Sequence, residues 1–492
     1  MKKILVVSDS LGTPIHARGI FNFTVGVVQI LRQLGHQVFL LVEPPVAGSF
    51  VTASSEELKS VHGPGIRRAL LSDLIRHFHG DRFRFDWHYG DPSLQRLAEN
   101  HPAIMNFKLS LDDAKKKSHQ IQFDVDRAEL GDHGLTHQSQ HLALFDGFVS
   151  LPNFYSDSFR RAANRLRPPV IDAAGFDHVI VDTPHYLSLD GVSRDNVHYV
   201  VHDFIPFYDV SMGYDWRQLF TSKIESTMRC GANAIFNSET TRLHFASIYG
   251  PDAVRRHVTI YPPIREEAVE AARSLDRTAR SRYMWSIQGN KRRESVEWQR
   301  NLANRRGAKA RLRHLFKPNP EWNPDLPFFC SVLSDEPRKN VAALVEASKA
   351  FIGKANFVVV GQINGDAYMN GRPEKFPNLH FTGYLSDEDK FDLLKTCSAF
   401  IFPSRSEGFG IPIVEAATLG APVICTDIEV FREITYDKAY YFDANRSGDL
   451  VRVIQDFQKD VDSARKASML KQMVDDAFLQ DKMASRIEYL LG

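Results

Sequence analysis

Cysteine is scarce in this chain of 492 residues, and it follows no recognisable pattern. The four cysteines are widely scattered, so they offer neither the paired spacing of a zinc site nor a disulfide framework. Cys397 and Cys425 lie in apolar sequence, where we expect buried thiols. This cysteine usage favours a reduced, cytosolic protein.

Long hydrophobic runs are also missing. No stretch approaches the ~20 apolar residues that a membrane-spanning helix needs. The apolar run at residues 4–7 is shorter than the core of about 7–15 residues in a signal peptide. Hydrophobic residues make up 43% of the chain and charged residues 25%, which is ordinary for a globular protein. Any membrane contact is therefore expected to be peripheral.

Two further absences narrow the functional classes. The formal net charge is only +1, so the whole chain has no general attraction to nucleic acid. The loop after the first expected strand, residues 4–7, lacks the GxGxxG motif of dinucleotide-binding proteins, which disfavours a nicotinamide enzyme. The length leaves room for two or three domains, each with its own core.

The most informative stretch is residues 399–426. It predicts a strand at 399–402, a loop at 404–410, a helix that begins near Pro412, and a second strand at 422–426. Such a unit belongs to a parallel sheet, in which ligands bind beyond the carboxyl ends of the strands. The loop lies at that end, and Gly408 and Gly410 allow its backbone to approach a ligand closely.

Two glutamates flank this loop and the start of the helix. Glu415 lies in the first turns, near backbone N–H groups that attract anions, and Glu407 lies eight residues earlier. A phosphate would bind the helix N-terminus, while carboxylates on either side accept hydrogen bonds from hydroxyl groups. This arrangement predicts a sugar nucleotide as ligand. The simpler alternative is two surface glutamates beside an ordinary helix start.

The run from Glu407 to Glu415, EGFGIPIVE, resembles the Glu-x7-Glu motif of retaining glycosyltransferases with the GT-B fold, especially glycosyltransferase family four. The resemblance implies an α/β protein with two Rossmann-like domains facing a cleft. It also implies transfer of a hexose from a nucleotide diphosphate sugar, with Glu407 at the sugar hydroxyls and Glu415 at the ribose. The implied donor-binding loop between them comprises Gly408, Phe409, Gly410 and Ile411.

A second match is the segment EPRKN at residues 336–340, which follows an expected strand at 328–333. Adjacent cations at a loop-to-helix junction suit a diphosphate, Arg338 as a bidentate fork and Lys339 as a point charge. The segment resembles the corresponding part of the family. It departs from the pattern at residues 331–334, which replace the usual glycine-bearing approach. A solvated surface pair is the alternative.

The resemblance implies two more donor contacts and one at the first loop. Tyr384 and Leu385 end a short expected strand at the level where the family contacts the nucleotide base, largely through backbone. The family's first strand is followed by a glycine-bearing loop, which we expect at residues 8–19. Gly19 ends this expected loop and begins the segment that matches the family best. There the absence of a side chain would let a substrate approach the backbone.

The segment HYVVHDFIP, residues 198–206, resembles the family's H-D-x-x-P motif. An apolar strand carries His202 and Asp203 to its carboxyl end, where ligands bind. The resemblance implies that His202 lies near the transferred sugar. Asp203 either orients the imidazole or caps a turn.

Two regions carry weaker signals. His133, His137 and His141 share one face if residues 133–141 form a helix, but no carboxylate or cysteine is spaced to complete a metal site, so no metal is expected. Residues 265–325 are rich in basic residues and tryptophan, with a cluster at 291–293. They could bind anionic lipid or a polyanionic acceptor, or form a solvated insertion; nucleic acid is physically possible but not expected.

We therefore expect an acceptor-binding domain at residues 1–264, a basic insertion at 265–325, a nucleotide-sugar domain at 326–480 and a helix end at 481–492. The H-D-x-x-P style resembles bacterial mannosyl- and rhamnosyltransferases of surface-polysaccharide synthesis. It favours GDP-mannose as donor. We further expect a glycan or lipid-linked acceptor, no metal, and a cytoplasmic protein that is peripheral at the membrane. The rivals are a GT-B sugar-nucleotide epimerase, a phosphorylase with a pyridoxal lysine, and a non-catalytic membrane or nucleic-acid binder.

Overall fold

The computed structural model describes most of two α/β units and leaves two long stretches undescribed. The described residues are 1–12, 18–43, 120–125, 135, 139–151, 154–208, 214–264, 268–272, 326–478 and 480–492. Unit 1 consists of Met1–Asn237, Thr241–Tyr261 and Gln480–Gly492, and unit 2 of Ser238–Thr240 and Pro262–Leu479. The basic cluster at 291–293 and most of residues 55–145 lie outside the described residues.

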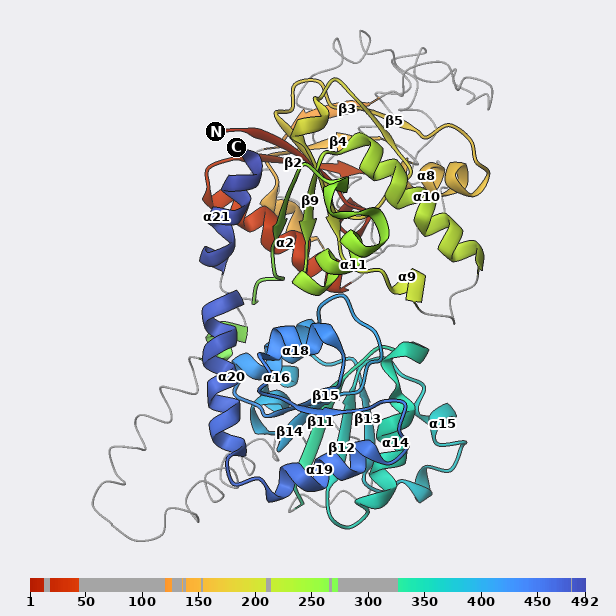
Figure 1. The fold of residues 1–492 in the computed structure, drawn as a ribbon, viewed down its shortest axis with the longest axis vertical. Helices are drawn as coiled ribbons and strands as arrows, with labels where there is room; N and C mark the ends of the chain where they lie inside the picture. The colour runs from red at the N-terminus through yellow and green to blue at the C-terminus, as the bar shows by residue number, and fades with distance from the viewer. Residues whose placement is uncertain are drawn as a thin grey trace, which may run out of the picture. The chain divides into compact units, whose positions relative to one another are not determined.

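Unit 1 is built on an eight-stranded sheet with the order β10-β9-β8-β6-β1-β2-β4-β3 (Figure 1). All neighbours in it pair in parallel except β3 and β4, which are antiparallel. Two further strands, β5 and β7, form a small parallel pair of their own. The strands are β1 (Lys3–Val7), β2 (Gln37–Val42), β3 (Ile121–Asp124), β4 (Gly147–Ser150), β5 (Val170–Asp172), β6 (His178–Val181), β7 (Ser188–Asp190), β8 (Val197–Val201), β9 (Asn233–Phe236) and β10 (Arg256–Thr259).

The core of unit 1 has two parts, one on each face of this sheet. Side chains alternate along a strand, so Ile4 and Val6 of β1 enter one hydrophobic cluster while Leu5 and Val7 enter the other. This is why β1 reads as an unbroken apolar run. The helices are α1 (Asp9–Gly12), α2 (Arg18–Gln33), α8 (Phe154–Ala163), α9 (Ile205–Tyr208), α10 (Tyr214–Cys230), α11 (Glu239–Tyr249) and α21 (Gln480–Leu491), with 3-10 turns η3 (Gln140–Leu144), η4 (Arg194–Asn196) and η5 (Pro251–Ala253).

The last helix, α21, belongs to unit 1. Met483 and Ile487 join the same apolar cluster as Val27 of α2. The two ends of the chain lie side by side (Figure 1), where Lys2 Nζ donates to the carbonyl of Leu491 at 2.6 Å. The end of the sequence is therefore part of the first unit's core.

Unit 2 is a six-stranded, wholly parallel sheet with the order β13-β12-β11-β14-β15-β16. Its central strands β11, β12 and β14 are buried almost throughout, and the chain winds outward from β11 in both directions. The strands are β11 (Phe328–Val332), β12 (Asn356–Val360), β13 (Leu379–Gly383), β14 (Ala399–Phe402), β15 (Val423–Thr426) and β16 (Tyr440–Phe442).

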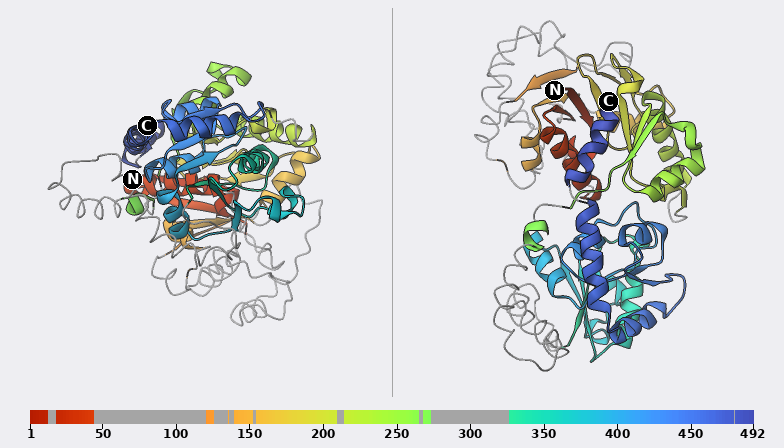
Figure 2. Two further views of the ribbon diagram at one scale, coloured as in Figure 1. Left: turned by 90° about the horizontal axis from the view of Figure 1, so that it is seen from below. Right: turned by 60° about the vertical axis from the view of Figure 1, so that its left-hand side comes forward.

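Helices cover both faces of the sheet of unit 2. In one group α14 packs on α19, and in the other α17 packs on α16, α18 and α20. The right-hand view of Figure 2 shows the long blue helix α20 lying along unit 2. The helices are α14 (Val341–Ala350), α15 (Gly365–Tyr368), α16 (Asp387–Thr396), α17 (Ile411–Thr418), α18 (Glu429–Thr435), α19 (Asp449–Lys459) and α20 (Ser463–Phe478), with 3-10 turns η6 (Pro337–Lys339) and η7 (Pro373–Lys375).

The structure confirms the α/β prediction and the strand–loop–helix–strand unit at β14, α17 and β15. It also confirms that Cys397 and Cys425 are buried. The expected loop at residues 8–19 is wrong in part. Residues 9–12 form the short helix α1, and Gly19 lies in the first turn of α2. The sequence pattern missed α1 because it is a single turn, too short for helical periodicity to show.

Candidate active site

Arg338 and Lys339 form the last two residues of η6, immediately before α14, at the carboxyl end of β11. Between the turn and the helix, Asn340 adopts a left-handed conformation with φ 55°. This compact junction brings both cations to the ligand-binding edge of the sheet.

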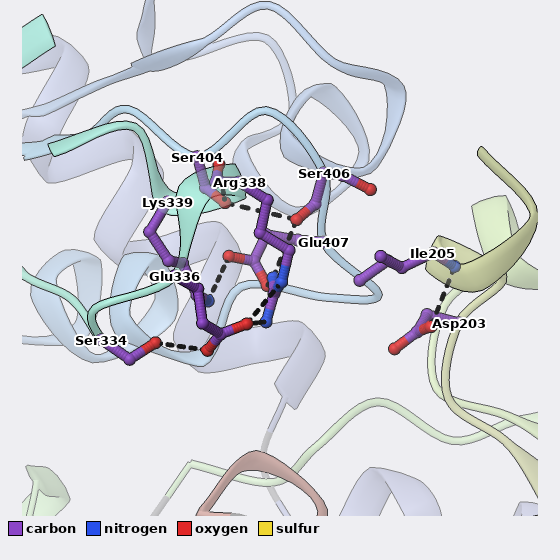
Figure 3. Close-up of polar contacts among 9 residues, drawn as sticks. All are labelled: Asp203, Ile205, Ser334, Glu336, Arg338, Lys339, Ser404, Ser406 and Glu407. Carbon is purple, nitrogen blue, oxygen red and sulfur yellow. Dashed lines mark hydrogen bonds and ion pairs between the residues drawn. The ribbon is translucent and has the colours of Figure 1, made fainter. Parts of the chain in front are cut away.

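Glu407, in the loop after β14, lies between the two cations (Figure 3). One carboxylate oxygen accepts a hydrogen bond from Arg338 Nη1 at 3.0 Å, and the other accepts one from Lys339 Nζ at 2.5 Å. Arg338 also donates to the Ser406 carbonyl at 3.0 Å and pairs with Glu336 at 2.8 Å. Two elements that are about seventy residues apart in sequence are thus joined through one carboxylate.

Burial and charge act in opposite directions on Glu407, whose side chain is only 10% exposed. Burial by itself raises the pKa of this carboxyl group, but Lys339 and then Arg338 outweigh it, and the net pKa is lowered. The group is therefore ionised at neutral pH. Arg338 and Lys339 are suited to bind an anion that competes with this carboxylate, and a diphosphate matches their donors.

The start of α17 follows directly. Gly410 precedes the helix with φ 113°, and a Cβ there would lie 3.1 Å from the side chains of Ile434 and Phe431. The backbone conformation therefore favours glycine, and a Cβ would also force these two side chains to shift. Pro412 occupies the first turn, as expected, where it costs no hydrogen bond.

Glu415 is buried in the middle of α17 and is held by a residue that the sequence analysis missed. Lys390 of α16 donates to Glu415 Oε2 at 3.0 Å and also pairs with Asp387 at 3.1 Å. The Asp387–Lys390 spacing signals only an ordinary helical ion pair. No sequence pattern connects Lys390 with Glu415, because only the packing of α16 on α17 brings them together.

The other residues of the expected donor loop divide into two kinds. The Gly408 carbonyl accepts a hydrogen bond from Ser238 Oγ at 2.9 Å, and Ile411 is half-buried. Phe409 differs from these two, since its side chain is buried with its ring centroid 5.5 Å from that of Phe478. Phe409 therefore supports the loop from the core, and only its backbone is available to a ligand.

At the end of β13, Tyr384 is 54% exposed and Leu385 is half-buried. Both lie at the carboxyl edge of the same sheet as Arg338 and Lys339. In unit 1, the first turn of α2 leaves Gly19 exposed, and a Cβ there would meet no atom within 4 Å. Packing in the described part of the chain therefore does not require this glycine.

His202 follows β8 in unit 1 and is buried against Phe23, with ring centroids 5.0 Å apart. Its Nε2 lies 2.9 Å from the backbone carbonyl oxygen of Asp182 and 3.2 Å from Asp182 Oδ1. Asp203 accepts a hydrogen bond from the Ile205 N–H at 3.0 Å, so it caps a turn (Figure 3). The carboxylate beside His202 that the structure shows is Asp182, which the sequence analysis did not identify.

Of the three histidines at 133, 137 and 141, the structure describes His141. It is buried in η3, and its Nε2 lies 3.2 Å from the carbonyl oxygen of Leu11. His133 and His137 lie outside the described residues. Within the described ranges, no three His, Cys, Asp or Glu side chains are grouped as metal ligands. Among the helices that are described, none is both long and apolar enough to cross a bilayer.

Comparison with known proteins points to glycosyltransferases, most clearly in unit 2. Residues 312–472 match the family model for glycosyl transferases group 1. The serotype-specific mannosyltransferase WbdA of Escherichia coli is 34% identical over 139 residues, which cover 27% of this chain and 17% of WbdA. The D-rhamnosyltransferase WbpZ of Pseudomonas aeruginosa is 35% identical over 92 residues, or 18% of this chain and 24% of WbpZ.

The chain thus spans about a quarter or less of the length of these two relatives. A likeness in fold extends much further. The structure of HepE of Anabaena in complex with UDP and glucose aligns with 100% of this chain and 99% of that one, with a TM-score of 0.51 and 12% sequence identity. The chain accordingly has the GT-B type of fold, with two Rossmann-like units.

Proposed function

We propose that this chain is a retaining glycosyltransferase of family four. It transfers a hexose from a nucleotide diphosphate sugar to a hydroxyl group of a glycan or lipid-linked acceptor in bacterial surface-polysaccharide synthesis. The observation that carries the proposal is the convergence of Arg338, Lys339 and Glu407 at the carboxyl edge of a parallel sheet. This cluster lies inside the stretch that matches group 1 glycosyl transferases.

The proposed chemistry depends on charge at the leaving group. Arg338 and Lys339, with the N-terminus of α17, stabilise the negative charge that develops on the diphosphate. Preorganised charges of this kind are usually the largest single term in catalysis. They also supply the role that a divalent cation has in other phosphate sites, so we propose a reaction that is independent of metal ions.

The remaining roles concern hydroxyl groups. Glu407 binds hydroxyls of the transferred sugar, Glu415 binds the ribose, and His202 contacts the sugar or the acceptor. Ionised carboxylates accept hydrogen bonds from hydroxyls, and Glu407 is ionised because its pKa is lowered despite burial, through Lys339 and Arg338. We assign no side chain as nucleophile, because the leaving phosphate can take the proton of the attacking hydroxyl.

GDP-mannose is our proposed donor. The support is the resemblance of residues 202–206 to mannosyl- and rhamnosyltransferases, together with relatives that carry these two names. A thermal-shift panel of GDP, UDP, ADP and their sugars, without metal, tests both donor and site. A ligand that binds only the folded protein raises its melting temperature. We expect a shift with the guanine series that Glu415→Ala abolishes, whereas a flat panel would contradict the proposed activity.

We also propose that the protein is cytoplasmic and binds the inner face of the membrane through its basic segment at 265–325. The support is compositional, since Trp285, Trp298 and Trp322 lie among the cations of this basic segment. Replacing Lys291, Arg292 and Arg293 with Gln should weaken binding to liposomes of anionic phospholipid. If the unmodified protein does not bind these liposomes at all, the membrane proposal is wrong.

A further inference from the structure

The contact between His202 and Asp182 defines which imidazole nitrogen carries the proton. His202 Nε2 lies 2.9 Å from the backbone carbonyl oxygen of Asp182, and a carbonyl oxygen can only accept. Nε2 must therefore be the N–H donor. In the neutral ring, Nδ1 then has a lone pair and no proton.

The acceptor nitrogen, Nδ1, is not used within the described part of the chain. Among the residues that the structure describes, Nδ1 of His202 has no hydrogen-bond partner, although the ring is mostly buried. The ring makes a T-shaped contact with Phe23, which limits its rotation. Nε2 of His202 is thus hydrogen-bonded to Asp182, and Nδ1 is left as a hydrogen-bond acceptor at the carboxyl end of β8.

Asp182 is itself rigidly held. It is fully buried, and its Oδ2 accepts a hydrogen bond from Ser8 Oγ at 2.8 Å. Its backbone N–H donates to the carbonyl of Val7 at 2.8 Å. Ser8, Asp182 and His202 directly follow β1, β6 and β8, which are neighbours in the sheet. The orientation of the imidazole is therefore built into the sheet itself.

We propose that Asp182 is a positioning residue, whose carboxylate and carbonyl hold His202 so that Nδ1 accepts a hydrogen bond from a hydroxyl group of the substrate. A neutral imidazole whose Nδ1 carries no proton accepts a hydrogen bond from a hydroxyl group at that nitrogen. It cannot donate one there to an anion. The identity of the hydroxyl group rests on the proposed glycosyl transfer. Which nitrogen of His202 carries the proton does not depend on that proposal.

Asp203, which the sequence suggests as a partner of His202, and Asp182, which the structure shows beside it, supply a matched pair of variants. Asp203 follows His202 directly, yet its carboxylate accepts from Ile205 N–H in a turn. Asp182→Asn removes the charge beside the imidazole and keeps the size of the side chain. Asp203→Asn makes the same change one residue away and keeps an oxygen for the turn.

The first measurement is the tautomer of His202, by long-range 1H–15N NMR on protein with 15N-labelled histidine. The resonances of His202 are those that disappear in His202→Gln. We expect protonation at Nε2 in the unmodified protein and in Asp203→Asn, and an altered ring signal in Asp182→Asn. Protonation at Nδ1 in the unmodified protein would overturn the inference.

The second measurement is steady-state transfer from GDP-mannose, or from the sugar nucleotide that the thermal panel selects. Asp182→Asn should lower kcat by at least about tenfold with KM for the donor nearly unchanged, because positioning acts in the transition state. Asp203→Asn should stay within about twofold of the unmodified protein. Unchanged kcat in Asp182→Asn would contradict a positioning role.

Two outcomes need separate treatment. If no protein transfers any sugar, the proposed function has failed, and the NMR comparison alone decides: an unaltered ring in Asp182→Asn overturns the positioning role, and an altered one sustains it. If Asp182→Asn does not fold, Ser8→Ala removes the anchor on Oδ2 and leaves Asp182 in place. It should lower kcat by about threefold, again without a change in KM, and an unaffected kcat would overturn the proposal.

Discussion

The carboxyl edges of the two sheets carry different kinds of polar group. In unit 2, Arg338 and Lys339 are joined to Glu407 by ion pairs. In unit 1, the buried carboxylate of Asp182 is surrounded by hydrogen-bond partners, Ser8 and His202. The arrangement in unit 2 suits an anionic ligand, which can take the place of the Glu407 carboxylate beside the two cations. The arrangement in unit 1 suits the binding of a neutral hydroxyl group in a fixed orientation.

The two edges also differ in how far their residues are spread along the chain. In unit 2, each functional element is a short run of adjacent residues, and these runs lie within the stretch that matches group 1 glycosyl transferases. In unit 1, the three polar residues follow three different strands; Ser8 and Asp182 are 174 positions apart, and Asp182 and His202 are 20 apart. Site residues that form a short motif can be recognised from the sequence. Site residues that are scattered along the chain can be recognised only once the sheet brings them together.

Removing Lys339 is the strongest test of the ion-paired carboxyl edge of unit 2. Lys339→Ala should lower kcat/KM by about 10²–10³-fold, because a preorganised charge at the leaving group is lost. It should also weaken the binding of free nucleoside diphosphate, measured by calorimetry. The control is Lys354→Ala, at an exposed lysine in the same unit. If nucleotide affinity is unchanged in Lys339→Ala, this residue does not belong to the phosphate site.

Neutralising Glu407 should have opposite effects on transfer and on binding. Glu407→Gln should lower kcat by more than about 10²-fold, because a charged acceptor for sugar hydroxyls is lost. Free nucleoside diphosphate should bind at least as tightly as before, since the carboxylate no longer competes for Arg338 and Lys339. Equal loss of affinity for the free diphosphate and for the sugar nucleotide would assign Glu407 to the phosphate instead of the sugar.

Substituting Lys390 tests whether the ion pairs at the carboxyl edge of unit 2 also support ribose binding. Lys390→Ala should weaken nucleotide binding by about tenfold, equivalent to about 1.4 kcal/mol, because Glu415 loses the partner that orients it. The affinity for inorganic diphosphate should not change. Lys395→Ala is the matched control, since Lys395 lies on the same helix and pairs with Asp392 instead. Equal effects of the two variants would remove Lys390 from the site.

Acid should weaken unit 1, where buried histidines depend on being neutral. Burial lowers the pKa of His178 to about 4 and that of His198 to about 3. Between these values and about 6.5, the unfolded chain binds more protons than the folded chain, so stability falls as pH falls through this window. We expect a loss of about 1 kcal/mol or more per histidine at pH 4.5.

Hydrogen exchange on the whole protein checks this expectation. Protection in β6 and β8 should decrease more between pH 6.5 and 4.5, after correction for the intrinsic exchange rate, than protection in β11 and β14, which carry no histidine. His198→Gln should reduce the difference, because one of the groups that take up protons on unfolding is removed. The comparison leaves out β13, where burial lowers the pKa of His380 to about 4. Equal loss of protection in the two pairs of strands would show that His178 and His198 do not govern acid stability.

Local sequence was enough to predict much of the fold and part of the site. The buried parallel strands are apolar runs, and the α17 unit is marked by Gly410 and Pro412, whose conformations are intrinsic to those residues. Gly19 shows the limit of this reasoning, because a glycine near a helix start looks the same in a loop and in the first turn. Phe409 shows another, since an aromatic residue in a ligand-binding motif faces the core here.

By itself, the sequence determined the residue types, their order and the backbone freedom at a few points. These decide the α/β class, the cation pair at 338–339 and the glycine-rich start of α17, since each depends on neighbours within a few positions. Tertiary structure alone decided which polar groups meet: Glu407 with both cations, Lys390 with Glu415, and Asp182 with His202. Ion pairs and hydrogen bonds act over a few ångströms of space, and only the packing of the helices and the register of the strands set those distances.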